Sequence, residues 1–282
     1  MKKYELTNEN KVINGVECHR IKALVDFGKV IAGKIGGWIE SEKNLSQDGN
    51  AWVSGEAVVC GDAEVCGNAF VGGEAIVGGN AEVCGNVIVG ENAEVCGDAV
   101  VSGGARVGGD AEVCGNAEVC GEAVVDGDAR VYGNAFVGEE AIVCEDAEVR
   151  GNAIVGGNAE VSGEAVVSGN AEVCGDAEVC GDAEVCGEAV VSGDAEVSGE
   201  AVVSGDARVC EDADYIVFKN WWSSGRFFTW TRSNNMWRVG CFYGSVEELI
   251  AKAYKDSEKS GREYERVVKY VESILKEEND NK

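Results

Sequence analysis

Two apolar positions recur every six residues along most of this chain. From Gly49 to Cys210 the sequence is one phrase, Gly-Asn/Asp/Glu-Ala-x-Val-Cys/Ser/Gly, repeated 27 times without insertion or deletion. The fifth position is valine in all 27 repeats, and the third is alanine in 26, with Val87 as the exception. This period predicts a parallel β-helix, because stacked repeats bury an apolar face that a single repeat cannot bury.

Alternation within the phrase predicts which side chains face inward. Residues two apart in an extended strand point to the same side, so the alanine and the valine are expected in the core. The residue between them, for example Val58, Glu64 or Arg106, is expected to face solvent. Glycine opens 24 of the 27 repeats. This predicts a corner whose backbone conformation is costly for other residues.

The phrase resembles the hexapeptide-repeat superfamily, as in Val53-Ser54-Gly55-Glu56-Ala57-Val58. The resemblance implies an all-β solenoid, a left-handed parallel β-helix with three repeats per triangular coil, and a homotrimer. The 27 repeats would form about nine 18-residue coils, about 43 Å long at ~4.8 Å per strand spacing. In enzymes of that superfamily inserted loops build the active site, and a histidine on the coils is the general base. These repeats have neither, and the chain's single histidine, His19, precedes them.

Departures from the period divide the chain into three expected domains. They are an N-terminal β cap (1–48), the β-helix (49–213) and a small C-terminal α+β domain (214–282). In the cap we expect strands at 3–7, 16–25 and 30–34, with turns at 8–10, 14–15 and 27–28. Trp38, Ile39 and Leu45 are available to plug the open end of the solenoid. The segment 34–59 and the coils also resemble proteins of gut bacteria and their phages that are named as transferases or polymer-forming proteins.

Charge is distributed unevenly along the chain, whose formal net charge is −27. Residues 49–213 hold four Lys/Arg against 33 Asp/Glu, whereas the flanking segments are nearly neutral. Such a field repels phosphate backbones, so we expect no long nucleic acid as a partner. Stacked carboxylates such as Glu160, Glu178 and Glu196 are the basis of an alternative, divalent-cation binding, but solubility is the favoured explanation. No apolar run or secretory leader indicates a membrane, which leads us to expect a cytoplasmic protein.

Eleven of the 13 cysteines stand at the sixth position of the phrase, where they alternate with serine and glycine. In a cytoplasmic protein we expect them to be reduced. No Cys-x-x-Cys spacing suggests a metal or redox site, and no metal ligands are predicted. Cys66 with Cys84, and Cys96 with Cys114, are 18 residues apart and should stack in successive coils, where oxidation could link them.

One face of the solenoid is expected to be apolar at its start and acidic at its end. Its outward residues, taken from every third repeat, are Trp52, Phe70, Ile88, Arg106, Val124, Ile142, Glu160, Glu178 and Glu196. Apolar stripes of this size usually mark a contact. Either a neighbouring subunit or the ends of the chain should cover the first coils.

The segment 215–244 holds ten aromatic and four basic residues and no acid. Strands at 227–232 and 236–243 around Ser233-Asn234-Asn235 predict a β-hairpin. Ser245 with Glu248 forms a capping box that predicts a helix start. A second helix is expected at 262–276, where apolar residues recur at helical spacing.

Two interpretations of the hairpin stay open. Its aromatic residues either form the core of a small domain or line a pocket in which rings stack on a planar group and guanidinium groups hold an anion. The candidate ligand-binding residues are Trp222, Arg226, Phe228, Trp230, Arg232, Trp237 and Arg238. The favoured function is a non-catalytic scaffold without a cofactor that binds a small anionic, nucleotide-like ligand, for example in phage-type sequestration. The alternatives are an acyltransferase and a purely structural, self-assembling protein.

Overall fold

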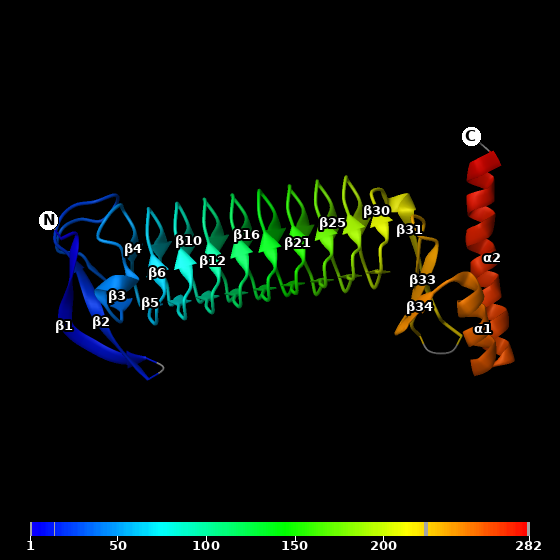
Figure 1. Ribbon diagram of the computed structural model, residues 1–282, viewed down its shortest axis with the longest axis horizontal. Coiled ribbons are helices and arrows are strands. Elements are labelled where there is room, and N and C mark those ends of the chain that lie inside the picture. Colours follow the sequence, from blue (N-terminus) through cyan, green and yellow to red (C-terminus); the bar gives the residue numbers. More distant parts are fainter. Residues whose placement is uncertain (1, 14, 223–224, 281–282) are drawn as a thin grey trace.

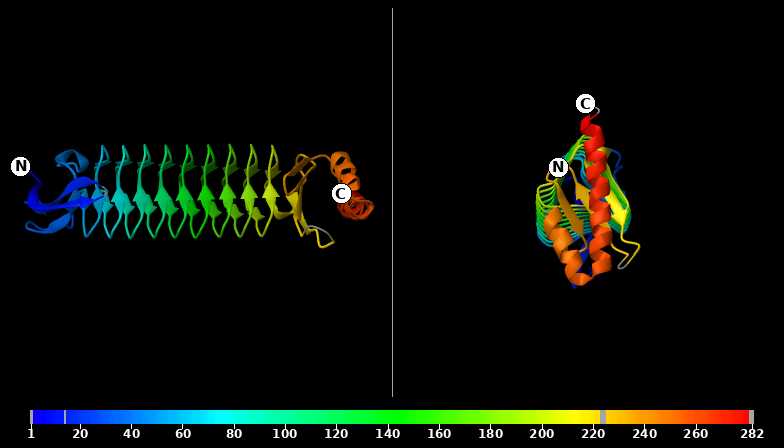
Figure 2. Two further views of the ribbon diagram at one scale, coloured as in Figure 1. Left: turned by 90° about the horizontal axis from the view of Figure 1, so that it is seen from below. Right: turned by 90° about the vertical axis from the view of Figure 1, so that its right-hand side faces the viewer.

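The computed structural model describes residues 2–13, 15–222 and 225–280 of a long β-solenoid. An antiparallel hairpin lies at its N-terminal end, and a small sheet and two helices lie at its C-terminal end (Figure 1). The coils stack along the long axis, and the small sheet separates them from the helices (Figure 2). The predicted all-β parallel solenoid is therefore confirmed. No helix in these described ranges is long and apolar enough to cross a membrane.

Two-residue strands form the faces of the solenoid, and each face is a parallel sheet. The first face consists of β4 (Trp52–Val53), β7 (Phe70–Val71), β10 (Ile88–Val89), β13 (Arg106–Val107), β16 (Val124–Val125), β19 (Ile142–Val143), β22 (Glu160–Val161), β25 (Glu178–Val179) and β28 (Glu196–Val197). The second consists of β5 (Val58–Val59), β8 (Ile76–Val77), β11 (Glu94–Val95), β14 (Glu112–Val113), β17 (Arg130–Val131), β20 (Glu148–Val149), β23 (Val166–Val167), β26 (Glu184–Val185) and β29 (Val202–Val203). The third consists of β6 (Glu64–Val65), β9 (Glu82–Val83), β12 (Val100–Val101), β15 (Glu118–Val119), β18 (Phe136–Val137), β21 (Ile154–Val155), β24 (Glu172–Val173), β27 (Val190–Val191) and β30 (Arg208–Val209).

Each strand pairs in register with the strands one coil away, as Val131 does with Val113 and Val149. The leader adds a partial coil, because β3 (Ile35–Ile39) pairs in parallel with β5 and Leu45 bridges to Val65. The solenoid therefore has about ten turns, and its stacking begins before the first complete phrase.

The inward alanine and valine side chains of the repeats are at most 1% exposed, as expected. At the corners the glycines adopt positive φ, for example +68° at Gly55, where an added Cβ would lie 2.9 Å from the Gly73 carbonyl oxygen. Of the outward residues, Glu64 and Arg106 are exposed, but Val58 is buried. The expectation for Val58 was wrong because Trp38 and Cys18 of the N-terminal cap cover it.

Glutamate replaces glycine at three corners of the repeat, and it keeps the left-handed conformation. Glu91, Glu139 and Glu145 have φ of 56°, 59° and 62°. In each case the carboxylate accepts a hydrogen bond from a glycine N–H one coil later, at 2.5–3.0 Å. These bonds to a charged acceptor offset part of the ~1–2 kcal/mol that the conformation costs a residue with a Cβ.

The N-terminal cap differs from the expected strands. β1 (Tyr4–Ile13) and β2 (Val16–Ala23) form the hairpin, and β1 runs through the expected turn at 8–10 with only a register shift. Asn14 lies outside the described residues. The expected strand at 30–34 is a turn region, and β3 follows it instead. Gly36 and Gly37 allow this, because a Cβ at either would lie 2.6 Å from a carbonyl oxygen of the first coil.

Two of the three expected plug residues, Ile39 and Leu45, close the end of the prism, whereas Trp38 packs outside the core on Val58. Ile39 and Leu45 are fully buried in the core of the solenoid, and Trp38 is 4% exposed beside β5. A short 3-10 helix, η1 (Glu42–Asn44), connects β3 to Leu45. The open end of the prism is therefore closed by the chain's own leader.

The two ends of the solenoid have opposite hydrogen-bonding needs. Within the coils, the N–H groups that donate to carbonyls of the following coil come mainly from the second, fourth and sixth positions of the phrase, as Trp52 N–H does to Ala69 O. The first coil is thus left with free carbonyls, and the last with free N–H groups, which would be costly if unpaired. Donors of the cap meet the first coil: Lys3 Nζ bonds Ala51 O at 3.0 Å, Arg20 Nη1 bonds Gly55 O at 2.7 Å, and Asn44 Nδ2 bonds Gly61 O and Ala63 O at 3.0 and 2.9 Å.

Side-chain oxygens meet the last coil. The N–H groups donate as follows: Glu196 to Asp212 Oδ1 at 2.9 Å, Ser198 to Tyr215 Oη at 3.3 Å, Val202 to Thr229 Oγ1 at 2.8 Å, Arg208 to Ser233 Oγ at 2.6 Å, and Cys210 to Asp214 Oδ2 at 2.8 Å. The C-terminal segment therefore seals the strand edges of the prism as well as its core.

A four-stranded antiparallel sheet and two helices form the described part of the C-terminal segment. The 3-10 helix η2 (Asp212–Asp214) leads into β31 (Tyr215–Lys219), which the sequence analysis did not predict. β32 (Phe227–Thr231) and β33 (Met236–Val239) form the expected hairpin. The expected strand at 236–243 is wrong in its second half, because the chain turns at Gly240 (φ 56°) and returns as β34 (Phe242–Gly244).

Both expected helices are present. α1 (Val246–Asp256) begins at the capping box of Ser245 and Glu248, which is confirmed. α2 (Glu258–Asp280) begins earlier and ends later than the expected range of 262–276. The helices pack on each other and on the face of the sheet that is turned away from the solenoid. Their apolar stripes are buried in this contact.

Candidate functional site

The C-terminal sheet has two different faces. Thr229 and Thr231 are buried on one face, and Thr229 bonds the end of the solenoid. Phe228 and Trp230 alternate onto the other face, where they pack under the helices. Strand alternation thus gives the sheet one polar capping face and one aromatic core face.

Phe228, Trp230 and Trp237, three of the seven candidate ligand-binding residues, lie in the core of this segment. Their exposed fractions are 0%, 1% and 1%. The Trp230 ring N–H donates to Asn235 Oδ1 at 2.9 Å, which fixes the hairpin turn. Burial of these rings supports the interpretation of the aromatic residues as a core.

The other candidates lie apart from one another. Trp222 is half-buried against Phe228 and Tyr264, each ring centroid 5.8 Å away. Arg232 joins the sheet to the solenoid end, because its Nε donates to Ala213 O at 3.1 Å and lies 3.8 Å from Asp214 Oδ1. Arg238 is half-buried and contributes a positive charge near Cys186 and Tyr243. The structure therefore does not gather all seven residues around one cavity.

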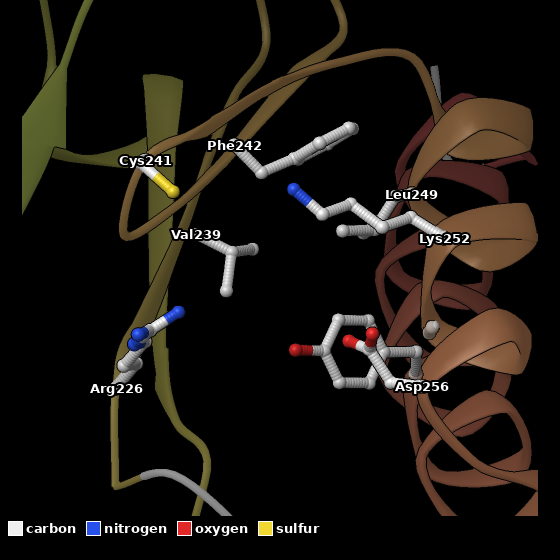
Figure 3. A pocket seen from close by; sticks show the side chains of 9 residues that line it. Arg226, Val239, Cys241, Phe242, Leu249, Lys252 and Asp256 are labelled. Atoms are coloured by element: carbon white, nitrogen blue, oxygen red, sulfur yellow. The ribbon is translucent and has the colours of Figure 1, made fainter.

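A small pocket between the sheet and the helices contains one of the candidates. Arg226 comes from the sheet side, whereas Lys252 and Asp256 come from α1 (Figure 3). The cavity volume is about 50 Å³. The full lining is Arg226, Val239, Cys241, Phe242, Leu249, Lys252, Ala253, Asp256 and Tyr264.

The charged groups of this pocket, on Arg226, Lys252 and Asp256, are exposed, whereas Tyr264 between them is half-buried. Burial raises the pKa of Tyr264, and Asp256 raises it further, so its hydroxyl stays a neutral donor. Lys252 Nζ lies 5.2 Å from the centre of the Phe242 ring, which orients the ammonium by a cation–π contact. Two cations and a hydroxyl against one carboxylate can hold a carboxylate or phosphate group, but the space is too small for a nucleobase.

The sequence analysis did not single out most of the residues of this pocket as ligand-binding. Tyr264 belongs to the apolar stripe of α2, which periodicity assigns to the core. Lys252 and Asp256 are four residues apart on α1, a spacing typical of ordinary exposed ion pairs. Only Arg226 was singled out, because the segment before the first strand of the hairpin is basic and free of acids.

A second concavity lies between the loop after β2 and the first coils. It has a volume of about 440 Å³ and includes Trp52, Phe70 and Ile88, as well as Lys29 and Lys34. Trp52 is buried against Phe27, whose ring centroid is 5.5 Å away, whereas Phe70 and Ile88 are 42% and 41% exposed. The chain's own leader thus covers only the start of the apolar face.

His19 is not part of either concavity. It lies on β2, half-buried, opposite Asn10 of β1 and Ile39 of β3. No coil strand contributes a histidine, because the chain has only this one. The coils therefore offer no imidazole base.

Comparison with known proteins gives a limited result. No family model matches the chain. The chain is 38% identical over 77 residues to the "Uncharacterized acetyltransferase YdcK" of Escherichia coli (strain K12), a match that covers 24% of this chain and 24% of that protein. The chain thus spans about a quarter of this relative. That similarity and the parallel β-solenoid together fit the hexapeptide-repeat superfamily.

Proposed function

We propose that this protein is a rigid cytoplasmic scaffold that holds a small-anion-binding unit at one end and associates with copies of itself. The observation that carries the proposal is the uninterrupted prism. In the described coils every turn keeps its 18 residues, and both ends are closed by dedicated caps. A spacer requires constant, stiff coils, whereas active sites of this type of fold require loops that interrupt them.

The anion-binding part of the proposal rests on the pocket between Arg226 and Lys252. Titration calorimetry of the full chain against phosphate, nucleotides, nicotinamide-derived compounds and coenzyme A tests it. We expect the anionic group alone to carry most of the affinity. Arg226→Gln should weaken binding ~10- to 100-fold, because a hydrogen bond to a charged group contributes ~1.5–3 kcal/mol.

Arg262→Gln is the matched control, because Arg262 is an exposed cation on α2 that does not line the pocket. It should leave affinity unchanged. If the wild type shows no heat of binding with any of these compounds, the anion site is refuted and only the scaffold part of the proposal remains. Equal losses in both variants would show that net charge, and not the pocket, attracts the anion.

Self-association is proposed from the exposed apolar side chains of the first face. Phe70, Ile88 and Ile142 on this face are 42%, 41% and 36% exposed, whereas the third face exposes Ile154 at 44%. A trimer is the favoured assembly. Ile88→Asp should convert it to monomers in sedimentation velocity, whereas Ile76→Asp on the second face should not. A wild type that sediments as a monomer at micromolar concentration would refute this part.

Acetyl transfer is the second candidate, and the similarity to a protein named as an acetyltransferase favours it. Incubation with acetyl-coenzyme A and a panel of amine and hydroxyl acceptors tests it. Released coenzyme A should be measured by chromatography, since the chain's 13 cysteines would react with thiol reagents. The scaffold proposal expects background turnover in wild type and in His19→Ala. Turnover that His19→Ala abolishes would replace the scaffold by an enzyme.

A further inference from the structure

The tripeptide Glu-Val-Cys stands twice at the same place of two consecutive coils. Residues 64–66 stack on residues 82–84 of the next coil, and residues 94–96 stack on residues 112–114 of the next coil. The register pairs glutamate with glutamate and valine with valine, so the cysteines also stack. Because glutamate and cysteine are two residues apart, both point outward while the valine is buried.

The second of these clusters brings ligand atoms together. One carboxylate oxygen of Glu112 and the sulfur atoms of Cys96 and Cys114 all lie within 4.8 Å of one another. All three side chains are half-buried. Their backbone is fixed by the coil hydrogen bonds, as from Cys96 N–H to Val113 O at 2.9 Å. The thiols of Cys96 and Cys114 also interact with each other, and Glu94 interacts with that of Cys96.

We propose that Cys96, Cys114 and Glu112 bind a soft divalent metal ion such as Zn²⁺ or Cd²⁺, with Glu94 as the fourth ligand. Thiolate sulfur selects such ions, and a tetrahedral zinc site accepts two sulfur and two oxygen ligands at about 2.3 and 2.1 Å. Sulfur ligands of one tetrahedral ion lie about 3.7 Å apart. The two sulfur atoms already lie within 4.8 Å of each other, on strands that are held in register.

The first cluster has the same composition, with Cys66, Cys84 and Glu82 grouped in the same way. Cys66 and Cys84 form a disulfide in the structure, across a Cα–Cα distance of 4.7 Å. A disulfide has no thiolate to offer, so this cluster binds metal only after reduction. Oxidation and metal binding therefore exclude each other at each stacked pair.

Burial and the negative surroundings of the proposed site raise the pKa values of its thiols, and the negative surroundings also attract a metal cation. Burial raises the pKa of Cys96, and burial with the Glu112 carboxylate raises the pKa of Cys114 to about 12. A thiol becomes a metal ligand by losing its proton. Binding follows M²⁺ + 2 RSH → M(SR)₂ + 2 H⁺, so affinity should increase steeply with pH. The acidic prism attracts the incoming cation and the adjacent carboxylates partly neutralise it.

Absorption spectroscopy of the full chain, reduced with a phosphine, tests the proposal. Cd²⁺ titration should produce a thiolate-to-metal charge-transfer band that saturates at two ions per chain, one for each cluster. Cys96→Ser should halve the band and the stoichiometry. Glu112→Gln should keep the band of its cluster but weaken that site ~10-fold or more, in the range seen when groups that support a metal are lost.

Cys120→Ser is the matched control. Cys120 also belongs to a Glu-Val-Cys tripeptide, but Ser102 and Gly138 occupy the stacked positions of the neighbouring coils. Both serine variants should fold, because serine occupies this corner in other repeats; far-ultraviolet circular dichroism checks this. The absence of a wild-type band overturns the proposal. A band that Cys96→Ser leaves intact, or that Cys120→Ser reduces equally, overturns it as well.

Discussion

Replacement of Val131 by aspartate is the most direct test of the inward and outward faces. Val131 is fully buried in β17, and its carbonyl accepts from Cys114 N–H at 3.0 Å. The matched control is Glu148→Gln on β20, one coil away. Glu148 points outward and lies 3.5 Å from Arg150 as a partly exposed ion pair.

The expected energies of the two changes differ severalfold. Val131→Asp loses ~1.5–3 kcal/mol of apolar burial. It also adds an unpaired buried charge, which costs several kcal/mol more. The sum is more than about 5 kcal/mol, comparable with the whole stability of many domains. Glu148→Gln removes a surface ion pair that contributes ~0–1 kcal/mol.

Hydrogen exchange measured by mass spectrometry locates the damage. Coils contact only their neighbours, so Val131→Asp should remove protection from peptides within 113–149 and leave 190–209 protected. Glu148→Gln should leave every peptide unchanged. Equal loss of protection in the two variants would show that the assignment of faces is wrong. Loss along the whole chain would instead refute the nearest-neighbour description of stability.

Two smaller predictions concern the caps. Thr229→Val should lower the free energy of unfolding by about 1–3 kcal/mol in chemical denaturation, because the Val202 N–H loses its acceptor. Lys3→Met should flatten the pH dependence of stability above neutrality. Burial lowers the pKa of Lys3 from 10.5 to about 8, so the unfolded chain binds more protons between these values. Wild-type stability should therefore rise with pH from about 8 to 10.5, and thermal unfolding of Lys3→Met should lack that rise.

The fold could be predicted where local pattern and tertiary packing agree. The parallel solenoid and its inward faces follow from Ala and Val at fixed places of a six-residue phrase, whereas three phrases per coil came from the superfamily resemblance. The capping box of Ser245 follows from local hydrogen bonding. The errors occur where a distant segment decides. Val58 is covered by Trp38, which is far away in sequence. The strand expected at 236–243 breaks at Gly240, since the shorter β34 can then pair with β33.

The candidate site was less predictable than the fold. An aromatic-basic segment indicates either a core or a pocket, and burial of Phe228, Trp230 and Trp237 supports the core. The pocket depends on Lys252 and Asp256, whose spacing carries no distinctive signal. The cysteine–glutamate clusters were missed for another reason. A search for Cys-x-x-Cys examines neighbours along the chain, whereas these ligands are neighbours only after coils stack.

The two caps are not interchangeable, and their register can be tested by deletion. The C-terminal cap places its acceptors on particular strands, with Thr229 at β29 and Ser233 at β30. Deletion of 151–168 removes one full coil and leaves every later strand, with the cap bonded to it, on its original face of the prism. Deletion of 151–156 also preserves the repeat phrase, but it moves every later strand to the next face of the prism.

The 18-residue deletion should therefore shorten the particle by ~4.8 Å in solution scattering and change its stability little. The six-residue deletion should rotate the C-terminal segment, with its cap, by one face relative to the N-terminal cap. Because the cap moves with the last coil, its own bonds survive, and stability should again change little.

The six-residue deletion should, however, disturb any assembly in which the N-terminal cap and the C-terminal segment of one chain must face the same neighbouring subunit. If the proposed self-association depends only on the apolar first coils, both deletions should assemble like wild type in sedimentation velocity. If it also uses the C-terminal segment, only the 18-residue deletion should assemble. Unfolding of the six-residue deletion would refute the argument, since it would show that the coils recognise absolute position and not only their neighbours.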